Sequence, residues 1–148
     1  MSWVSFEAVV ETLEWGRATY TILRLPPEAE AALGGARRVE GEVGDHPVNL
    51  AVTRAPVVEG AFLWAGKSFL RDVGARPGEP LDVRLRPADP RDVQTPEDVA
   101  AALRAAGRTA AWEALSAGRR RGLLHGVASA VAPATRARRV AALVAGLA

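Results

Sequence analysis

The feature that most constrains the fold is a change of hydrophobic pattern at a proline-rich stretch. Pro87, Pro90 and Pro96 fall within ten residues. Before them, apolar residues recur at every second position, which is typical of half-buried strands. After them, the chain is rich in alanine and its apolar residues recur every three or four positions, which is typical of helices. The sequence therefore predicts two domains, residues 1–88 and residues 89–148, on either side of a linker.

The sequence of residues 1–88 predicts six short strands that form a small barrel. Two sets of large apolar residues occupy every second position, and we expect all six side chains to face inward: Val48, Leu50, Val52, Leu81, Val83 and Leu85. The expected strands cover residues 3–11, 19–24, 39–43, 48–52, 61–65 and 81–85. Because the connections leave little room for crossover helices, an antiparallel or mixed barrel, closed or partly open, is favoured over a doubly wound sheet.

Two short helices are expected between these strands. One covers residues 29–33, because Pro26-Pro27 precedes it and Gly34-Gly35 follows it. The other covers residues 68–73 and ends at Gly74.

The sequence of residues 89–148 predicts three to four helices. Thr95 is the expected N-cap of the first helix, which ends at Gly107, and Ser116 is the expected cap of a later one. Two apolar stripes are expected to be buried: Leu123, Leu124, Val127 and Val131, and then Val140, Leu143, Val144 and Leu147. The fold class of the whole chain is therefore α+β.

Composition excludes several kinds of chemistry. The 148 residues include no cysteine, so disulfides, thiolate catalysis and cysteine-based zinc sites are excluded. Neither His46 nor His125 has a recognisable set of partner ligands, and no nucleophile-elbow motif is present, so we expect no metal, no cofactor and no catalytic residue. The N-terminus lacks a basic signal region and no apolar run approaches about 18 residues, which predicts a cytoplasmic protein without a membrane span.

The basic residues are concentrated in the second part. Residues 1–88 hold ten Lys/Arg and twelve Asp/Glu, whereas residues 89–148 hold nine and five. The two clusters are residues 119–121 and Arg136, Arg138 and Arg139. Because consecutive residues on a helix point about 100° apart, neither cluster presents one coherent stripe. Solvated faces and internal ion pairs are therefore favoured over contact with nucleic-acid phosphates.

One candidate site for a small anion lies at the start of the second short helix. Gly66, Lys67 and Ser68 place free backbone N–H groups there, next to Trp64 at the end of a strand. Lys67 is also the only lysine of the chain. The run from Gly60 to Ser68 fails as a P-loop because its spacing is one residue too long. The competing interpretation is that Lys67 only solvates a turn.

Arg136 is expected to clamp the last helix to its neighbours. Helical angles place it on the same stripe as Val140 and Leu143, whereas Arg138 points to solvent. A guanidinium on a buried face needs water or a carboxylate, which Glu113 or Asp98 would supply.

Several motifs carry a resemblance to a known family. They are residues 39–43 (Val-Glu-Gly-Glu-Val), residues 67–74 (Lys-Ser-Phe-Leu-Arg-Asp-Val-Gly), residues 112–116 with Arg120-Arg121 following, and Pro133 to Val140 with its Thr-Arg-Ala-Arg-Arg run. The chain resembles the bacterial YdeI/OmpD-associated proteins. That resemblance implies a six-stranded barrel followed by a helical tail, and an association with protection against bacteriocins or antimicrobial peptides. It implies no catalytic residues.

These observations favour a binding or stress-protection module without catalytic activity, whose partner is a small anionic ligand or a protein. Two alternatives stay open. The stretch from Leu70 to Leu85 also resembles swapped-hairpin transition-state regulators, which bind DNA as dimers. A small-molecule enzyme that uses the mouth of the barrel is the other. The oligomeric state is left open by the sequence.

Overall fold

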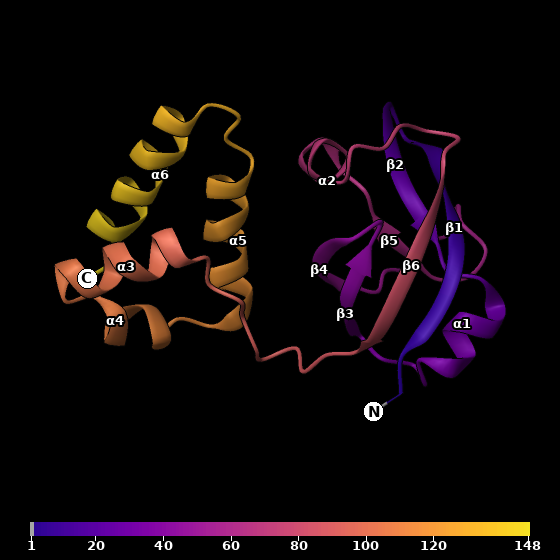
Figure 1. Cartoon of the computed structure of the whole chain (residues 1–148), viewed down its shortest axis with the longest axis horizontal. Helices are drawn as coiled ribbons and strands as arrows, with labels where there is room; N and C mark the ends of the chain where they lie inside the picture. Colours follow the sequence, from indigo (N-terminus) through magenta and orange to yellow (C-terminus); the bar gives the residue numbers. More distant parts are fainter. Residues whose placement is uncertain (1) are drawn as a thin grey trace. The chain divides into compact units, whose positions relative to one another are not determined.

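The structure, a computed structural model, describes residues 2–148 and divides the chain into two compact units (Figure 1). The first unit ends at Asp89 and the second begins at Pro90. The first contains β1 (Val4–Trp15), β2 (Ala18–Arg24), α1 (Pro27–Ala32), β3 (Arg38–Val43), β4 (His46–Ala51), β5 (Phe62–Trp64), α2 (Lys67–Val73) and β6 (Pro80–Pro87). The second contains α3 (Glu97–Ala106), α4 (Thr109–Glu113), α5 (Ala117–Ala128) and α6 (Pro133–Ala145). Whether each unit is a separate domain stays a prediction.

The first unit, called the β unit below, is built on one antiparallel sheet. Its strand order is β4-β3-β6-β1-β2-β5. The edge strands β4 and β5 are linked through Thr53, which follows β4 and exchanges two backbone hydrogen bonds of 2.9 Å with Phe62. This single bridge does not close the sheet. The predicted α+β class is confirmed, and the sheet is of the partly open kind.

Strand β1 joins the two halves of the sheet. Its first half pairs with β6, from Val4 opposite Leu85 to Val9 opposite Pro80. Its second half pairs with β2, beginning with Val10 opposite Leu23. One long strand therefore carries the chain from one half to the other.

The core of the β unit lies on the inner face of this sheet. All six alternating residues that the sequence predicts to face inward belong to it. Leu85 is 0% exposed, and Val83 and Val48 are also buried, while Leu50, Val52 and Leu81 are half-buried against them. The predicted register is thus confirmed.

The second unit, called the helical unit below, buries one face of each of its four helices. The shared core consists of Val99, Leu103, Trp112, Val127, Val140, Leu143 and Val144. Ser116 caps α5 as predicted, because its Oγ accepts a hydrogen bond of 3.2 Å from the backbone N–H of Arg119.

Two details of the predicted helical unit are wrong. Thr95 is not the cap of α3: the cap position is Pro96, which has no side-chain cap bond, and the Thr95 hydroxyl instead accepts a hydrogen bond from Trp112 Nε1 at 3.2 Å. Burial of the indole N–H requires an acceptor, and Thr95 provides it. Val131 is 80% exposed because α5 ends at Ala128, before the apolar period reaches it.

Candidate binding sites

The residues of the predicted anion site are adjacent in the structure. Gly66 and Lys67 are exposed and Ser68 is half-buried at the start of α2. Trp64 uses its ring for packing: it lies 4.9 Å from the Phe62 ring in an edge-on arrangement and 5.2 Å from the Tyr20 ring. Helix α2 has only seven residues, so its dipole adds little to binding there. The anion site stays a prediction.

A cleft that the sequence pattern does not indicate lies beside α1 in the β unit. Its volume is about 390 Å³, within the range of small-molecule sites. Its lining comes from two stretches of the chain, residues 25–37 and residues 52–54: Leu25, Glu30, Leu33, Gly35, Ala36, Arg37, Val52 and Arg54. Sequence reasoning missed it because the lining residues form no recognisable motif, and the two stretches meet only in the folded chain.

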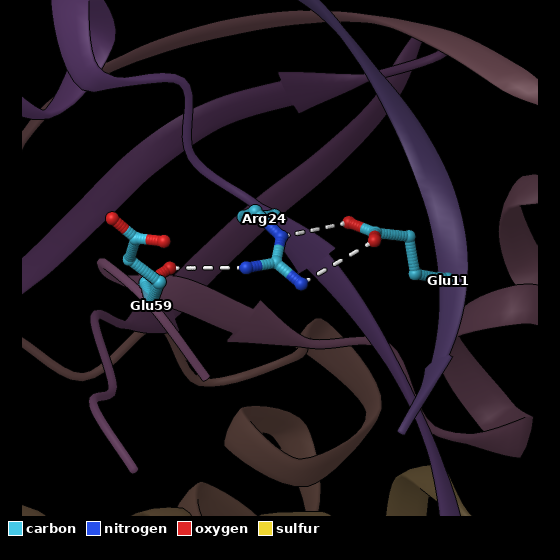
Figure 2. A network of polar contacts seen from close by, with 3 residues as sticks. All are labelled: Glu11, Arg24 and Glu59. Atoms are coloured by element: carbon cyan, nitrogen blue, oxygen red, sulfur yellow. Dashed lines mark hydrogen bonds and ion pairs between the residues drawn. The ribbon is translucent and has the colours of Figure 1, made fainter. Parts of the chain in front are cut away.

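The loop between β4 and β5, which borders this cleft, is held at two points. Glu30 of α1 pairs with Arg54, and its second oxygen accepts from the backbone N–H of Ala61 at 3.4 Å. Arg24 of β2 spans from β1 to the same loop, as Figure 2 shows. Its Nε and Nη2 atoms donate to the Glu11 carboxylate at 3.2 and 3.4 Å, and Nη1 donates to the carbonyl of Glu59 at 3.0 Å.

The helical unit carries a second, more apolar hollow between α5 and α6, called the α5–α6 groove below. Its volume is about 320 Å³. It is lined by Leu123, Gly126, Val127, Arg139, Ala142 and Leu143. Part of the apolar stripe that forms the core of this unit therefore also reaches its surface.

One arginine of each basic cluster, Arg121 and Arg139, is hydrogen-bonded within the helical unit. Arg121 donates to the carbonyls of Pro90 and Asp92, the second at 2.8 Å. Arg139 donates to the carbonyl of Gly126 and to Ser129 Oγ, both at 2.9 Å. These bonds fasten the linker to α5, and α6 to the end of α5. The two clusters thus contribute hydrogen bonds within the unit. This agrees with the expectation that consecutive arginines on a helix, which point in different directions, do not form one binding stripe.

Arg136 forms a two-point contact with Asp98 of α3. Its Nε lies 2.7 Å from Oδ2 and its Nη2 lies 3.0 Å from Oδ1. The Arg136 side chain is 34% exposed, whereas Arg138 is exposed and donates to Thr135. The Arg136 hydrogen bond is the main reason that the pKa of Asp98 lies below its ordinary value of 3.8; partial burial opposes the shift. The clamp role of Arg136 stays a prediction.

We expect Arg136→Ala to destabilise the helical unit by about 1 kcal/mol, because it removes a bidentate ion pair that is partly open to water and a side chain packed between helices. Arg138→Ala is the matched control and is expected to change the free energy of unfolding by less than about 0.5 kcal/mol. Thermal unfolding followed by circular dichroism at 222 nm measures both. Equal losses in the two variants would reject the clamp.

The same pair predicts a dependence on pH. Because the folded-state pKa of Asp98 is lowered, its contribution is fully present above the unfolded-state value and is lost as the pH falls through the folded-state value. The difference in stability between wild type and Arg136→Ala should therefore shrink below about pH 4. A difference that stays constant down to about pH 2 would mean that Asp98 is not the partner that matters.

Neither histidine belongs to a metal-ligand cluster. His46 lies in β4 and is half-buried, and His125 is exposed on α5. Within residues 2–148, no group of three or more His, Asp or Glu side chains is placed to hold a metal ion. In the same part of the chain, every helix is too short or too polar to cross a lipid bilayer.

Comparison with known proteins bears on the helical unit. Residues 92–148 match the model of a family described as bacteriocin-protection, YdeI or OmpD-associated. The sequence of the chain matches no curated protein. The family match begins two residues after the boundary between the units and extends to the end of the chain, so it covers helices α3 to α6. The predicted resemblance is therefore confirmed for the helical unit, which is similar to the YdeI/OmpD-associated family.

Proposed function

We propose that the chain protects a bacterial cell against a bacteriocin or a related antimicrobial peptide, and that its helical unit binds the peptide in the α5–α6 groove. One observation carries the proposal: every residue that lines the groove lies within the stretch that matches the bacteriocin-protection family. Protection by binding needs no catalytic residue, in keeping with what the sequence predicts.

The chemistry of the groove supports an amphipathic peptide as the partner. Leu123 and Leu143 provide apolar surface. Ala142 and Gly126 have small side chains or none, so they leave space for a ligand beside that surface. The Arg139 guanidinium at one side is already held by Gly126 and Ser129. The groove therefore offers apolar contact rather than a free charge, which suits the apolar face of a helix that lies in a groove.

The DNA-binding alternative receives less support. Arg121, Arg136 and Arg139 donate hydrogen bonds within the helical unit, so fewer arginines are left for phosphate contacts. The stretch that resembles swapped-hairpin regulators ends in β6, and β6 pairs with β1 and β3 of its own chain. A cytoplasmic location and the absence of catalytic activity stay predictions.

The proposal is tested with a bacterial strain that lacks the gene and is complemented with variants of the full chain. Gly126→Leu should abolish protection against a pore-forming bacteriocin, because the new side chain fills the groove while leucine is a good helix former. Nothing lies within 4 Å of a Cβ at this position, so the fold tolerates it. Survival is measured over a dilution series of the bacteriocin.

Gly118→Leu is the matched control. It makes the same change on the same helix, it also meets nothing within 4 Å, and it lies outside the groove. It should protect as well as the wild type. If the strain that carries the wild-type gene were not protected, the proposed function would be contradicted. If both leucine variants protected equally well, the groove would be contradicted as the binding site.

A further inference from the structure

We infer that the cleft beside α1 in the β unit binds a small organic monoanion with an apolar tail, such as a medium-chain carboxylic acid. This site is independent of the peptide-binding function proposed for the helical unit. It is also separate from the predicted anion site at Gly66, Lys67 and Ser68, none of which lines the cleft.

The inner surface of the cleft is apolar. Leu25 and Leu33 are only 3% and 4% exposed and lie beside the half-buried Ala36 and Val52. A strongly hydrated ion such as inorganic phosphate would lose water against these side chains without gaining hydrogen bonds from them. A hydrocarbon tail would instead be removed from water.

The charges at the rim favour an anion. The two oxygens of Glu30 are engaged by Arg54 and by the N–H of Ala61, so this carboxylate is neutralised inside the structure. Within residues 2–148, the Arg37 side chain has neither a hydrogen bond nor an ion pair. Arg37 is exposed and lines the cleft, so one positive charge is left over for a ligand carboxylate, which a guanidinium binds in two-point geometry.

The walls of the cleft are fixed before any ligand arrives. The backbone N–H of Val52 donates to the carbonyl of Arg37 at 2.9 Å, which joins its two stretches. Glu30 and Arg24 hold the loop that follows Val52. A preformed site of this kind loses little entropy when it orders a ligand.

The test uses the full chain, labelled with ¹⁵N, and octanoate as the probe. In an NMR titration, octanoate should shift the amide signals around Leu33, Ala36 and Val52. Octan-1-ol, which has the tail without the charge, and inorganic phosphate, which has the charge without the tail, should bind at least about tenfold more weakly.

Two matched variants decide whether Arg37 provides the charge. Arg37→Gln should weaken octanoate binding about 10- to 100-fold. Arg17→Gln makes the same change at an exposed arginine in the turn before β2 and should leave binding unchanged. Equal effects of the two variants would overturn the inference, as would shifts confined to the helical unit or no binding at millimolar octanoate. None of these outcomes affects the bacteriocin assay, so the two proposals fail separately.

Discussion

Replacing Leu85 by alanine is expected to lower the free energy of unfolding of the β unit by about 2 to 5 kcal/mol. Leu85 is fully buried in the middle of β6, opposite Val4 of β1 on one side and Gly41 of β3 on the other. The substitution removes three carbon atoms and leaves a cavity that the paired strands on both sides keep from collapsing. Urea unfolding followed by tryptophan fluorescence measures the loss.

Val57→Ala is the control for Leu85→Ala. Val57 is 52% exposed in the loop between β4 and β5, so its substitution should change the free energy of unfolding by less than about 0.5 kcal/mol. If Leu85→Ala had as small an effect, the inward face assigned to β6 would be wrong.

The strands of the β unit could be predicted because their residues alternate locally. Val83 and Leu85 are buried while Asp82 and Arg84 are exposed, and this period of two is visible without any knowledge of the partners. The order of the strands could not be predicted in the same way. The pairing of β6 with both β1 and β3 depends on which strands meet across some 40 to 80 residues of chain. Nothing in a local pattern specifies that choice.

The two predicted caps, Ser116 and Thr95, show where a tertiary contact overrides a local preference. Both residue types accept hydrogen bonds from a helix N-terminus, and Ser116 does so. Thr95 instead accepts a hydrogen bond from Trp112, which lies 17 positions later. A buried indole N–H without an acceptor costs more free energy than a helix end whose N–H groups can bind water. A tertiary contact of this kind leaves no signature near Thr95 in the sequence.

The candidate sites also differ in how far a local sequence pattern indicates them. Arg136 could be found from helical angles alone, because its stripe is local, and the structure places it on Asp98, one of the two carboxylates named in advance. The cleft beside α1 combines residues of two separate stretches, residues 25–37 and residues 52–54. Its one unpaired guanidinium, Arg37, stands next to Arg38 in the sequence, and only the fold distinguishes the two: Arg38 donates to Asn49.

Gly41→Ala is expected to lower the free energy of unfolding of the β unit by about 2 to 6 kcal/mol, from backbone strain and overpacking together. Gly41 has a φ of +150°, which side chains rarely permit, and it lies in β3 between the buried residues Val39 and Val43. A Cβ there would lie 1.9 Å from the carbonyl oxygen of Arg84. That oxygen belongs to the backbone of β6, so the two strands would have to separate.

Gly74→Ala separates the two causes. Gly74 ends α2 with a φ of +76°, and a Cβ built there meets nothing within 4 Å, so alanine adds strain without a collision. We expect a loss of about 1 to 2 kcal/mol for this control. A similar loss for Gly41→Ala would mean that conformational strain alone explains the glycine. A clearly larger loss, measured by urea unfolding, would mean that close approach of β3 to β6 requires it, since no other residue leaves room for the Arg84 carbonyl.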